Sequence, residues 1–297
     1  MNAEIVKTPL AALHRARACH WTTAWLTYLK EKVATVVDAA MIQNSFVFLE
    51  RISSEKEKGL WQQGILNWDD FLRTKEIRGI SAAAKKYYDR KIVEARRHLH
   101  LQNSSYFCDK LPAKEQWRLY EFFKEEAVYL DIETDGLSDN NDVTLVGLFD
   151  GFDTKTMIRR VNLDWQLLRK ELQKYKIIVT FNGSVFDIPF MKKRYGEIIP
   201  QIPHYDLRFC CSKLGLKGGL KQVEKQLNIR RRDIVEALYG GDAAQLYRMW
   251  RGSGDDYYLR LLVEYNEEDV INLKRIADYA YSELKKFTFA AVAGIPA

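Results

Sequence analysis

Cysteine is scarce in this sequence, and its few cysteines are not spaced for metal binding. They are Cys19, Cys108, Cys210 and Cys211, among 297 residues. No C-x-x-C pair occurs, which argues against a zinc or iron–sulfur site. Neighbours such as Cys210 and Cys211 rarely pair with each other, so the cysteines are expected to be free thiols in a reducing compartment.

Long hydrophobic runs are missing as well, and so are internal repeats and low-complexity segments. No apolar stretch reaches the roughly 18–20 residues that a membrane-spanning helix needs. The apolar residues 21–40 are interrupted by charges from Lys30 to Lys32 and at Asp38, and no secretory cleavage site follows them. The sequence therefore predicts a cytoplasmic protein with no membrane partner.

Neither sign of charge dominates the chain, although the net charge of +6 is unevenly distributed. Residues 1–126 hold 21 basic and 16 acidic residues, whereas residues 127–297 hold 25 and 24. The positive excess in the first part is available to contact phosphates. The second part is nearly balanced, and it contains the acidic motifs described below.

The pattern divides the chain into three predicted parts. Residues 1–40 form an N-terminal extension, and a natural start at Met41 is one hypothesis for it. Residues 41–125 form a helical, helix-hairpin-helix-like module, and residues 126–288 form an α/β domain. The hypothesis of a start at Met41 is tested by mass spectrometry of the native protein.

Capping residues mark the helices of the module. Ser53 or Ser54 begins one helix and Asn67 begins another. A long basic helix is expected from about Ala82 to Leu101, with its basic residues at positions 85, 86, 90, 91, 96 and 97. This charge run is interpreted either as a solvated face or as a surface that contacts phosphates.

From residue 127 the sequence alternates between strands and helices. Three consecutive strands are expected at 127–133, 143–151 and 154–161, and a further apolar strand at 176–181. A helix is expected over 163–175, a short strand at 204–207, and mostly helix from there to 287. This order predicts a mixed sheet flanked by helices, as in the ribonuclease-H-like fold class.

Acidic residues recur in three separate segments of this predicted domain. In YLDIETDGL, Asp131 and Glu133 lie two apart on a strand, so both side chains point to one face. Their mutual repulsion favours a hard divalent cation between them. A strand that ends in polar residues is the alternative reading of this segment.

The second segment, FNGSVFDIPF, places Asp187 at a helix N-terminus, where an N-capping aspartate is the alternative. The third, EYNEEDVINL, places Tyr265 and Asp269 four residues apart on one helical face. An amphipathic helix with an acidic exposed face is the alternative there, and Glu267 and Glu268 suit such a face better.

Together, the three segments resemble the motifs of the DEDD superfamily of 3′→5′ exonucleases, in the branch whose last motif has a tyrosine. The second motif is also similar to that of family B DNA polymerase proofreading domains. Over roughly residues 42–285 the chain resembles the YprB-like, ribonuclease-H-like exonucleases, in which a helical module precedes the D-x-E strand. The sequence has Ser53–Ser54 where that module is expected to have a glycine-bearing hairpin.

The resemblance implies two Mg²⁺ or Mn²⁺ ions held by four carboxylates. Asp131 would hold both ions, Glu133 and Asp269 the ion that activates water, and Asp187 the second ion. Tyr265 would orient the attacking water. The substrate implied is the 3′ end of a DNA or RNA strand.

Residues outside the motifs are weaker candidates for substrate contacts. Asn182 is expected to contact the terminal nucleotide, and Phe186 either to stack on a base or to pack in the core. Lys221 and Lys217 are interpreted either as contacts to phosphates or as part of a solvated surface. Asp206, at another strand end, is a candidate for supporting the site.

Two other functions remain open at this point. One is a catalytically silent module that binds nucleic acid, and the other is a structure-specific endonuclease with the same metal site. The sequence does not distinguish DNA from RNA.

Overall fold

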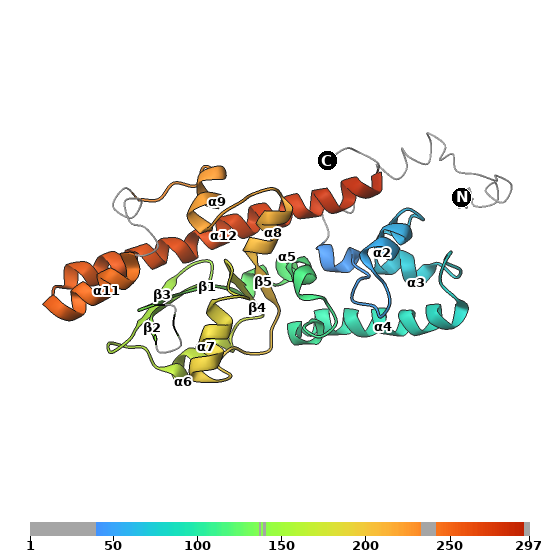
Figure 1. Cartoon of the computed structure of the whole chain (residues 1–297). Helices are drawn as coiled ribbons and strands as arrows, with labels where there is room; N and C mark the ends of the chain where they lie inside the picture. The colour runs from blue at the N-terminus through green and yellow to red at the C-terminus, as the bar shows by residue number, and fades with distance from the viewer. Residues whose placement is uncertain (1–39, 137, 139–140, 233–241, 294–297) are drawn as a thin grey trace, which may run out of the picture.

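The computed structural model describes residues 40–136, 138, 141–232 and 242–293. The predicted N-terminal extension, apart from Ala40, lies outside these residues. The described chain forms a helical N-terminal part, a five-stranded sheet and a very long C-terminal helix (Figure 1). None of the described helices is both long and apolar enough to cross a membrane.

Side-chain caps start the three longest α-helices of the N-terminal part, and the caps at Ser53 and Asn67 confirm the prediction from the sequence. Ser53 accepts a hydrogen bond from Lys56 N, Asn67 from Asp70 N, and Ser81 from Ala84 N. The helical elements that precede the sheet are η2 (Met41–Asn44), α2 (Ser54–Trp61), α3 (Trp68–Arg73), α4 (Ala82–His100), η3 (Ser104–Phe107), η4 (Ala113–Leu119), α5 (Tyr120–Phe123) and η5 (Lys124–Glu126).

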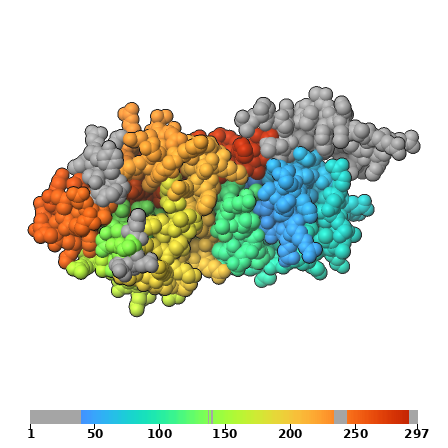
Figure 2. All heavy atoms as spheres, viewed as in Figure 1, coloured from blue at the N-terminus to red at the C-terminus, as the bar shows by residue number. Residues whose placement is uncertain are grey.

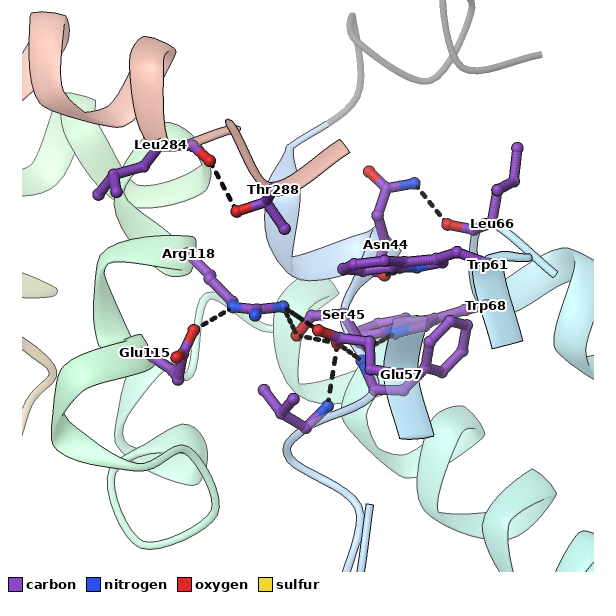
Figure 3. A network of polar contacts seen from close by, with 12 residues as sticks. Asn44, Ser45, Glu57, Trp61, Leu66, Trp68, Glu115, Arg118, Leu284 and Thr288 are labelled. Carbon is purple, nitrogen blue, oxygen red and sulfur yellow. Dashed lines mark hydrogen bonds and ion pairs between the residues drawn. The ribbon is translucent and has the colours of Figure 1, made fainter. Parts of the chain in front are cut away.

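A buried ion cluster connects these helices (Figure 3). The Arg118 guanidinium lies between Glu57 and Glu115, with N–O distances of 2.9 and 2.8 Å, and all three side chains are buried. Glu57 Oε1 also accepts from the backbone N–H groups of Phe46 and Val47. These hydrogen bonds satisfy charges that would otherwise be costly to bury.

The sheet has the strand order β3-β2-β1-β4-β5. Strands β1, β2 and β3 form the predicted antiparallel meander, and β4 and β5 run parallel to β1. The strands are β1 (Ala127–Thr134), β2 (Val143–Phe149), β3 (Thr154–Ile158), β4 (Ile177–Thr180) and β5 (His204–Asp206). Strands β2 and β3 end before residues 151 and 161, the ends that the sequence suggested.

Helices cover both faces of the sheet, so this is the mixed α/β fold that the sequence predicts. The helices are α6 (Trp165–Leu172), α7 (Asp187–Tyr195), α8 (Leu207–Lys213), α9 (Leu220–Gln226), α11 (Asp242–Ser253) and α12 (Asp256–Ala293). Helix α6 is shorter at both ends than the expected range 163–175, and it begins at Trp165 because Asp164, with an extended backbone, is its N-cap.

The alternation of β1 sends its side chains into two different layers. Val128, Leu130 and Ile132 pack with residues of α6 and α7. Tyr129 packs on the opposite face, in the hydrophobic core to which α12 contributes. Because strand residues two apart share a face, Asp131 and Glu133 follow Tyr129 toward α12.

Helix α12 joins the two parts of the molecule. It contacts β1 to β4 and then continues along the N-terminal part (Figure 1). Near its end, Phe289 packs on Trp61, with ring centroids 5.2 Å apart, and Tyr281 accepts a hydrogen bond from Met41 N. The parts share one hydrophobic cluster and form a continuous body in Figure 2. The predicted boundary at residue 125 stays a prediction.

Candidate active site

Three predicted carboxylates meet where β1 ends beside α12. One carboxylate oxygen from each of Asp131, Glu133 and Asp269 lies within 4.8 Å of the other two. Asp131 and Glu133 are partly exposed, whereas Asp269 is buried. The structure therefore brings together acidic residues that lie more than 130 positions apart in the sequence.

Asp187 reaches the same place from α7. It is the first residue of that helix and is 3% exposed, and its Oδ1 accepts a hydrogen bond from Ile132 N at 3.2 Å. The N-cap position belongs to Phe186, which makes no side-chain cap, so the reading of Asp187 as an N-cap is wrong. Its carboxylate bonds to the strand between Asp131 and Glu133 instead.

A cavity of about 360 Å³ opens over these carboxylates. With the exception of Lys217, every residue that the sequence proposed for catalysis or substrate binding lines it. The lining residues are Asp131, Ile132, Glu133, Phe181, Asn182, Phe186, Asp187, Gly219, Leu220, Lys221, Gln222, Tyr265 and Asp269.

The carboxylates repel one another at close range. Burial raises the pKa of Asp131 and of Glu133 well above the usual range, and the charge of Asp269 raises both further. Burial also raises the pKa of Asp187 to about 7. The pKa of Asp269 rises to about 6 through burial, although the neighbouring Arg231 opposes the rise.

Tyr265 lies one helical turn before Asp269, and its side chain is buried. Burial raises the pKa of its hydroxyl, and the negative charge of Asp269 raises it further. The hydroxyl is therefore protonated at neutral pH, where it can donate a hydrogen bond but cannot act as a base. The Lys221 ammonium lies 4.7 Å from the centre of the tyrosine ring.

The loop between β4 and α7 places Asn182 and Phe186 at the cavity. Asn182 has a positive φ of 67°, a conformation that asparagine tolerates better than most residues. Asp206 fixes this loop because its carboxylate accepts hydrogen bonds from the backbone N–H groups of Asn182 and Ser184. Asp206 thus supports the loop from the end of β5, as the sequence suggested that it could.

Sequence reasoning missed Arg231 and Asn266. Arg231 is buried in contact with Asp269, and its guanidinium also pairs with Glu224 at 2.7 Å. Asn266 is fully buried and donates a hydrogen bond to Asp131. The available signal for Asn266 was its spacing, since it lies four residues from both Leu262 and Val270, which belong to the apolar face of the helix.

The donor set fits divalent metal ions. All the candidate ligands are carboxylate oxygens, which hard cations such as Mg²⁺ and Mn²⁺ prefer. The raised pKa values show that their negative charges are poorly compensated by the protein alone, and bound cations would supply that compensation.

One comparison with known protein families supports this fold. A family model described as the RNase_H superfamily matches residues 128–281, more than half of the chain. One similar solved structure is the family B DNA polymerase from the hyperthermophilic archaeon Pyrobaculum calidifontis. The identity is 15% and the TM-score 0.46, over 57% of this chain and 27% of the polymerase chain. No curated protein is similar enough to count as a match.

The matched range begins in β1 and ends in α12, so it contains the whole carboxylate cluster. The chain belongs to the RNase_H superfamily.

Proposed function

We propose that this protein is a 3′→5′ exonuclease that hydrolyses single-stranded nucleic acid with two Mg²⁺ or Mn²⁺ ions. The observation that carries the proposal is the cluster of Asp131, Glu133 and Asp269, whose oxygens lie within 4.8 Å of one another. Asp187 and Tyr265 line the same cavity, which completes the set of residues that the tyrosine-type exonuclease motifs require.

A phosphodiester is hard to hydrolyse because its charge repels hydroxide and its alkoxide is a poor leaving group. Two bound cations supply an activated water and stabilise the leaving oxygen. In the proposed arrangement Asp131, Glu133 and Asp269 would hold the ion that activates water, and Asp131 and Asp187 would hold the ion that stabilises the leaving oxygen. The P–O3′ bond breaks, which releases a nucleoside 5′-monophosphate and leaves a new 3′-hydroxyl on the strand.

Tyr265 orients the attacking water in this proposal. Its raised pKa keeps the hydroxyl protonated, so the side chain acts as a hydrogen-bond donor. Lys221, held beside the tyrosine ring, is suited to contact the phosphate that is attacked. Replacing Tyr265 by phenylalanine should therefore slow the reaction without abolishing it.

The cavity favours a strand end over a duplex. At about 360 Å³ it lies at the small end of ligand pockets. Asn182 is placed to bond the terminal nucleotide. Phe186, partly buried against Phe190 with ring centroids 5.6 Å apart, is placed to meet its base.

The decisive experiment uses single strands labelled at either end, as matched DNA and RNA, with Mg²⁺ or Mn²⁺. The wild type should release the 3′ label first, as mononucleotides. Asp131→Ala and Asp187→Ala should each abolish this release, and Tyr265→Phe should slow it roughly 100-fold. Glu283→Gln, which alters a surface pair on the same helix, should leave it unchanged. Full activity of Asp131→Ala would refute the proposal.

A circular single strand distinguishes the endonuclease alternative. An exonuclease cannot begin on a circle, so the circle should survive under conditions in which the matched linear strand is degraded. Cleavage of the circle that depends on Asp131 would replace the exonuclease proposal with the endonuclease one.

A further inference from the structure

One buried side chain at the active site is not among the defining residues of the three motifs. Asn266 follows Tyr265 on α12 and is 0% exposed, although Glu267 and Glu268, which follow it, are partly exposed. Its amide points toward the end of β1. It forms a hydrogen bond with a residue 135 positions away in the sequence.

The Asn266 amide contacts the first carboxylate of the first motif. Its Nδ2 donates a hydrogen bond to Asp131 Oδ2 at 2.9 Å. A lysine or arginine here would neutralise this carboxylate, whereas the neutral amide holds it and leaves its charge available to a cation.

The orientation of the amide follows from this contact. Because Nδ2 faces the carboxylate, Oδ1 faces away from it and is buried without a hydrogen-bond partner. A flipped amide would place Oδ1 against the oxygen of Asp131, which is a repulsive contact. The protein therefore leaves one buried acceptor unsatisfied to keep the donor on Asp131.

Gly147 on β2 makes room for this amide. It is the register partner of Asp131, and a Cβ added to it would lie 1.7 Å from Asn266 Oδ1 and 2.8 Å from Cγ. Gly147 is not among the glycines with positive φ, so its backbone is one that alanine can adopt. Glycine is therefore needed at this position because a side chain would not fit, and not because of the backbone conformation.

We propose that Asn266 is a positioning residue that holds Asp131 for the metal ions, and that Gly147 forms the slot that admits its amide. The proposal rests on the proposed function, because it assigns these residues a role toward the metal site. Residues that orient metal ligands typically affect metal affinity by 10–100-fold.

The test is a double-mutant cycle with Asn266→Ala, Gly147→Ala and the double variant. The Mn²⁺ dissociation constant is measured from the dependence of Tm on Mn²⁺ concentration, and kcat and KM from degradation of a labelled strand at saturating Mn²⁺. Asn266→Ala should weaken Mn²⁺ binding at least about 10-fold and lower kcat, with KM for the strand unchanged. Gly147→Ala should do the same because its methyl group displaces the amide.

The double variant should bind Mn²⁺ no more weakly than Asn266→Ala alone. It should also have a higher Tm than Gly147→Ala, since removing the amide removes the clash. A double variant with additive losses would overturn the assignment of Gly147. Asn266→Ser, whose side chain is too short to reach Asp131, replaces Asn266→Ala should that variant fail to fold.

Asn44 provides a matched control in the N-terminal part. It is also 0% exposed, donates one amide hydrogen bond, to Leu66 O at 3.0 Å, and has a buried Oδ1 without a partner. Asn44→Ala should lower Tm without changing the Mn²⁺ dissociation constant. If Asn266→Ala behaves like Asn44→Ala, Asn266 is merely structural and the proposal is overturned.

The wild type separates this proposal from the proposed function. A wild type with no Mn²⁺-dependent rise in Tm and no nuclease activity would overturn both. A wild type that binds Mn²⁺ and degrades the strand, together with an Asn266→Ala variant that does so equally well, would overturn the role of Asn266 alone.

Discussion

Asp131 illustrates a conflict between stability and function at a single residue. Its carboxylate is crowded by Asp269, Glu133 and Asp187, and its pKa is raised well above the usual range. In the metal-free protein this charge is a source of repulsion. The same charge is needed to bind a divalent cation. Bound cations or protons therefore stabilise the site, because they reduce the repulsion between its carboxylates.

Replacing Asp131 by asparagine should therefore stabilise the metal-free protein. The amide oxygen can still accept from Asn266, while the repulsion is lost, so the free energy of unfolding in EDTA should rise by roughly 1–2 kcal/mol. The same variant should lose the Mn²⁺-dependent rise in Tm. Urea denaturation with EDTA and with Mn²⁺ measures both, and a variant less stable than the wild type in EDTA would contradict the prediction.

Arg118 shows the opposite situation, in which buried charges are compensated within the protein. Its guanidinium pairs with Glu57 and Glu115, and Ser45 accepts a further hydrogen bond from it at 2.8 Å (Figure 3). Removing one member of such a cluster leaves the others buried without their counter-charge.

Arg118→Met should lower the free energy of unfolding by about 3–5 kcal/mol, since two buried carboxylates lose their cation. Arg96→Met breaks the exposed pair with Asp69 and should cost less than about 1 kcal/mol. Chemical denaturation of both variants gives the comparison. Equal losses would show that burial of the Arg118 cluster does not govern its contribution.

At the level of elements, α4 has a basic stripe, defined here as Lys86, Arg90 and Arg97. All three are exposed, are spaced by four and then by seven residues, and form no ion pair with another described residue. Lys91 on the same helix pairs with Glu94 at 2.9 Å. The sequence left a solvated face and a phosphate-binding surface as alternatives for this helix, and exposed cations without an ion pair are compatible with both.

Changing the basic stripe to glutamine at all three positions should weaken binding of a single strand and reduce its salt dependence. Each phosphate contact contributes about 0.7 to the slope of log K against log salt, so the slope should fall by about 2. Binding is measured in EDTA to prevent cleavage. Lys91→Gln is the control with little expected effect, and an unchanged slope in the triple variant would identify the stripe as a solvated face.

Helix α12 is the element on which the site depends most. Its 38 residues span roughly 57 Å, and it carries Tyr265, Asn266 and Asp269 over the sheet before it reaches the N-terminal part. The sequence indicated mostly helix from 207 to 287 but not a single helix of this length. Its length depends on two partners, the sheet and the module, which local patterns do not show.

At the level of the whole molecule, the shared core predicts cooperative unfolding. Residues of the N-terminal part, of the sheet and of α12 belong to one hydrophobic cluster, which includes Trp61, Tyr129 and Leu284. A division into independently stable units would require each unit to have its own core.

Thermal unfolding should therefore be a single transition. Tryptophan fluorescence, to which Trp61, Trp68 and Trp117 contribute, should give the same Tm as far-UV circular dichroism. Mn²⁺ at 100 times its dissociation constant should add about 2.7 kcal/mol and shift both signals together by several degrees. Two separate transitions, or a shift confined to one signal, would contradict the shared core.

The sequence by itself determined the elements and the positions of the candidate ligands on them. A period of two puts Asp131 and Glu133 on one face of a strand, and a period near four puts Tyr265 and Asp269 on one face of a helix. These relations are local, so they hold wherever the elements are placed. That the three segments form one site was expected from the family resemblance.

Only the tertiary structure decided how the site is supported. The pairing of Arg231 with Asp269, the hydrogen bond from Asn266 to Asp131 and the space above Gly147 join residues of different elements. No local period encodes such contacts, because they depend on how α12 is seated on the sheet. The same holds for the core shared by the two parts, which exists because one helix is long enough to pack on both.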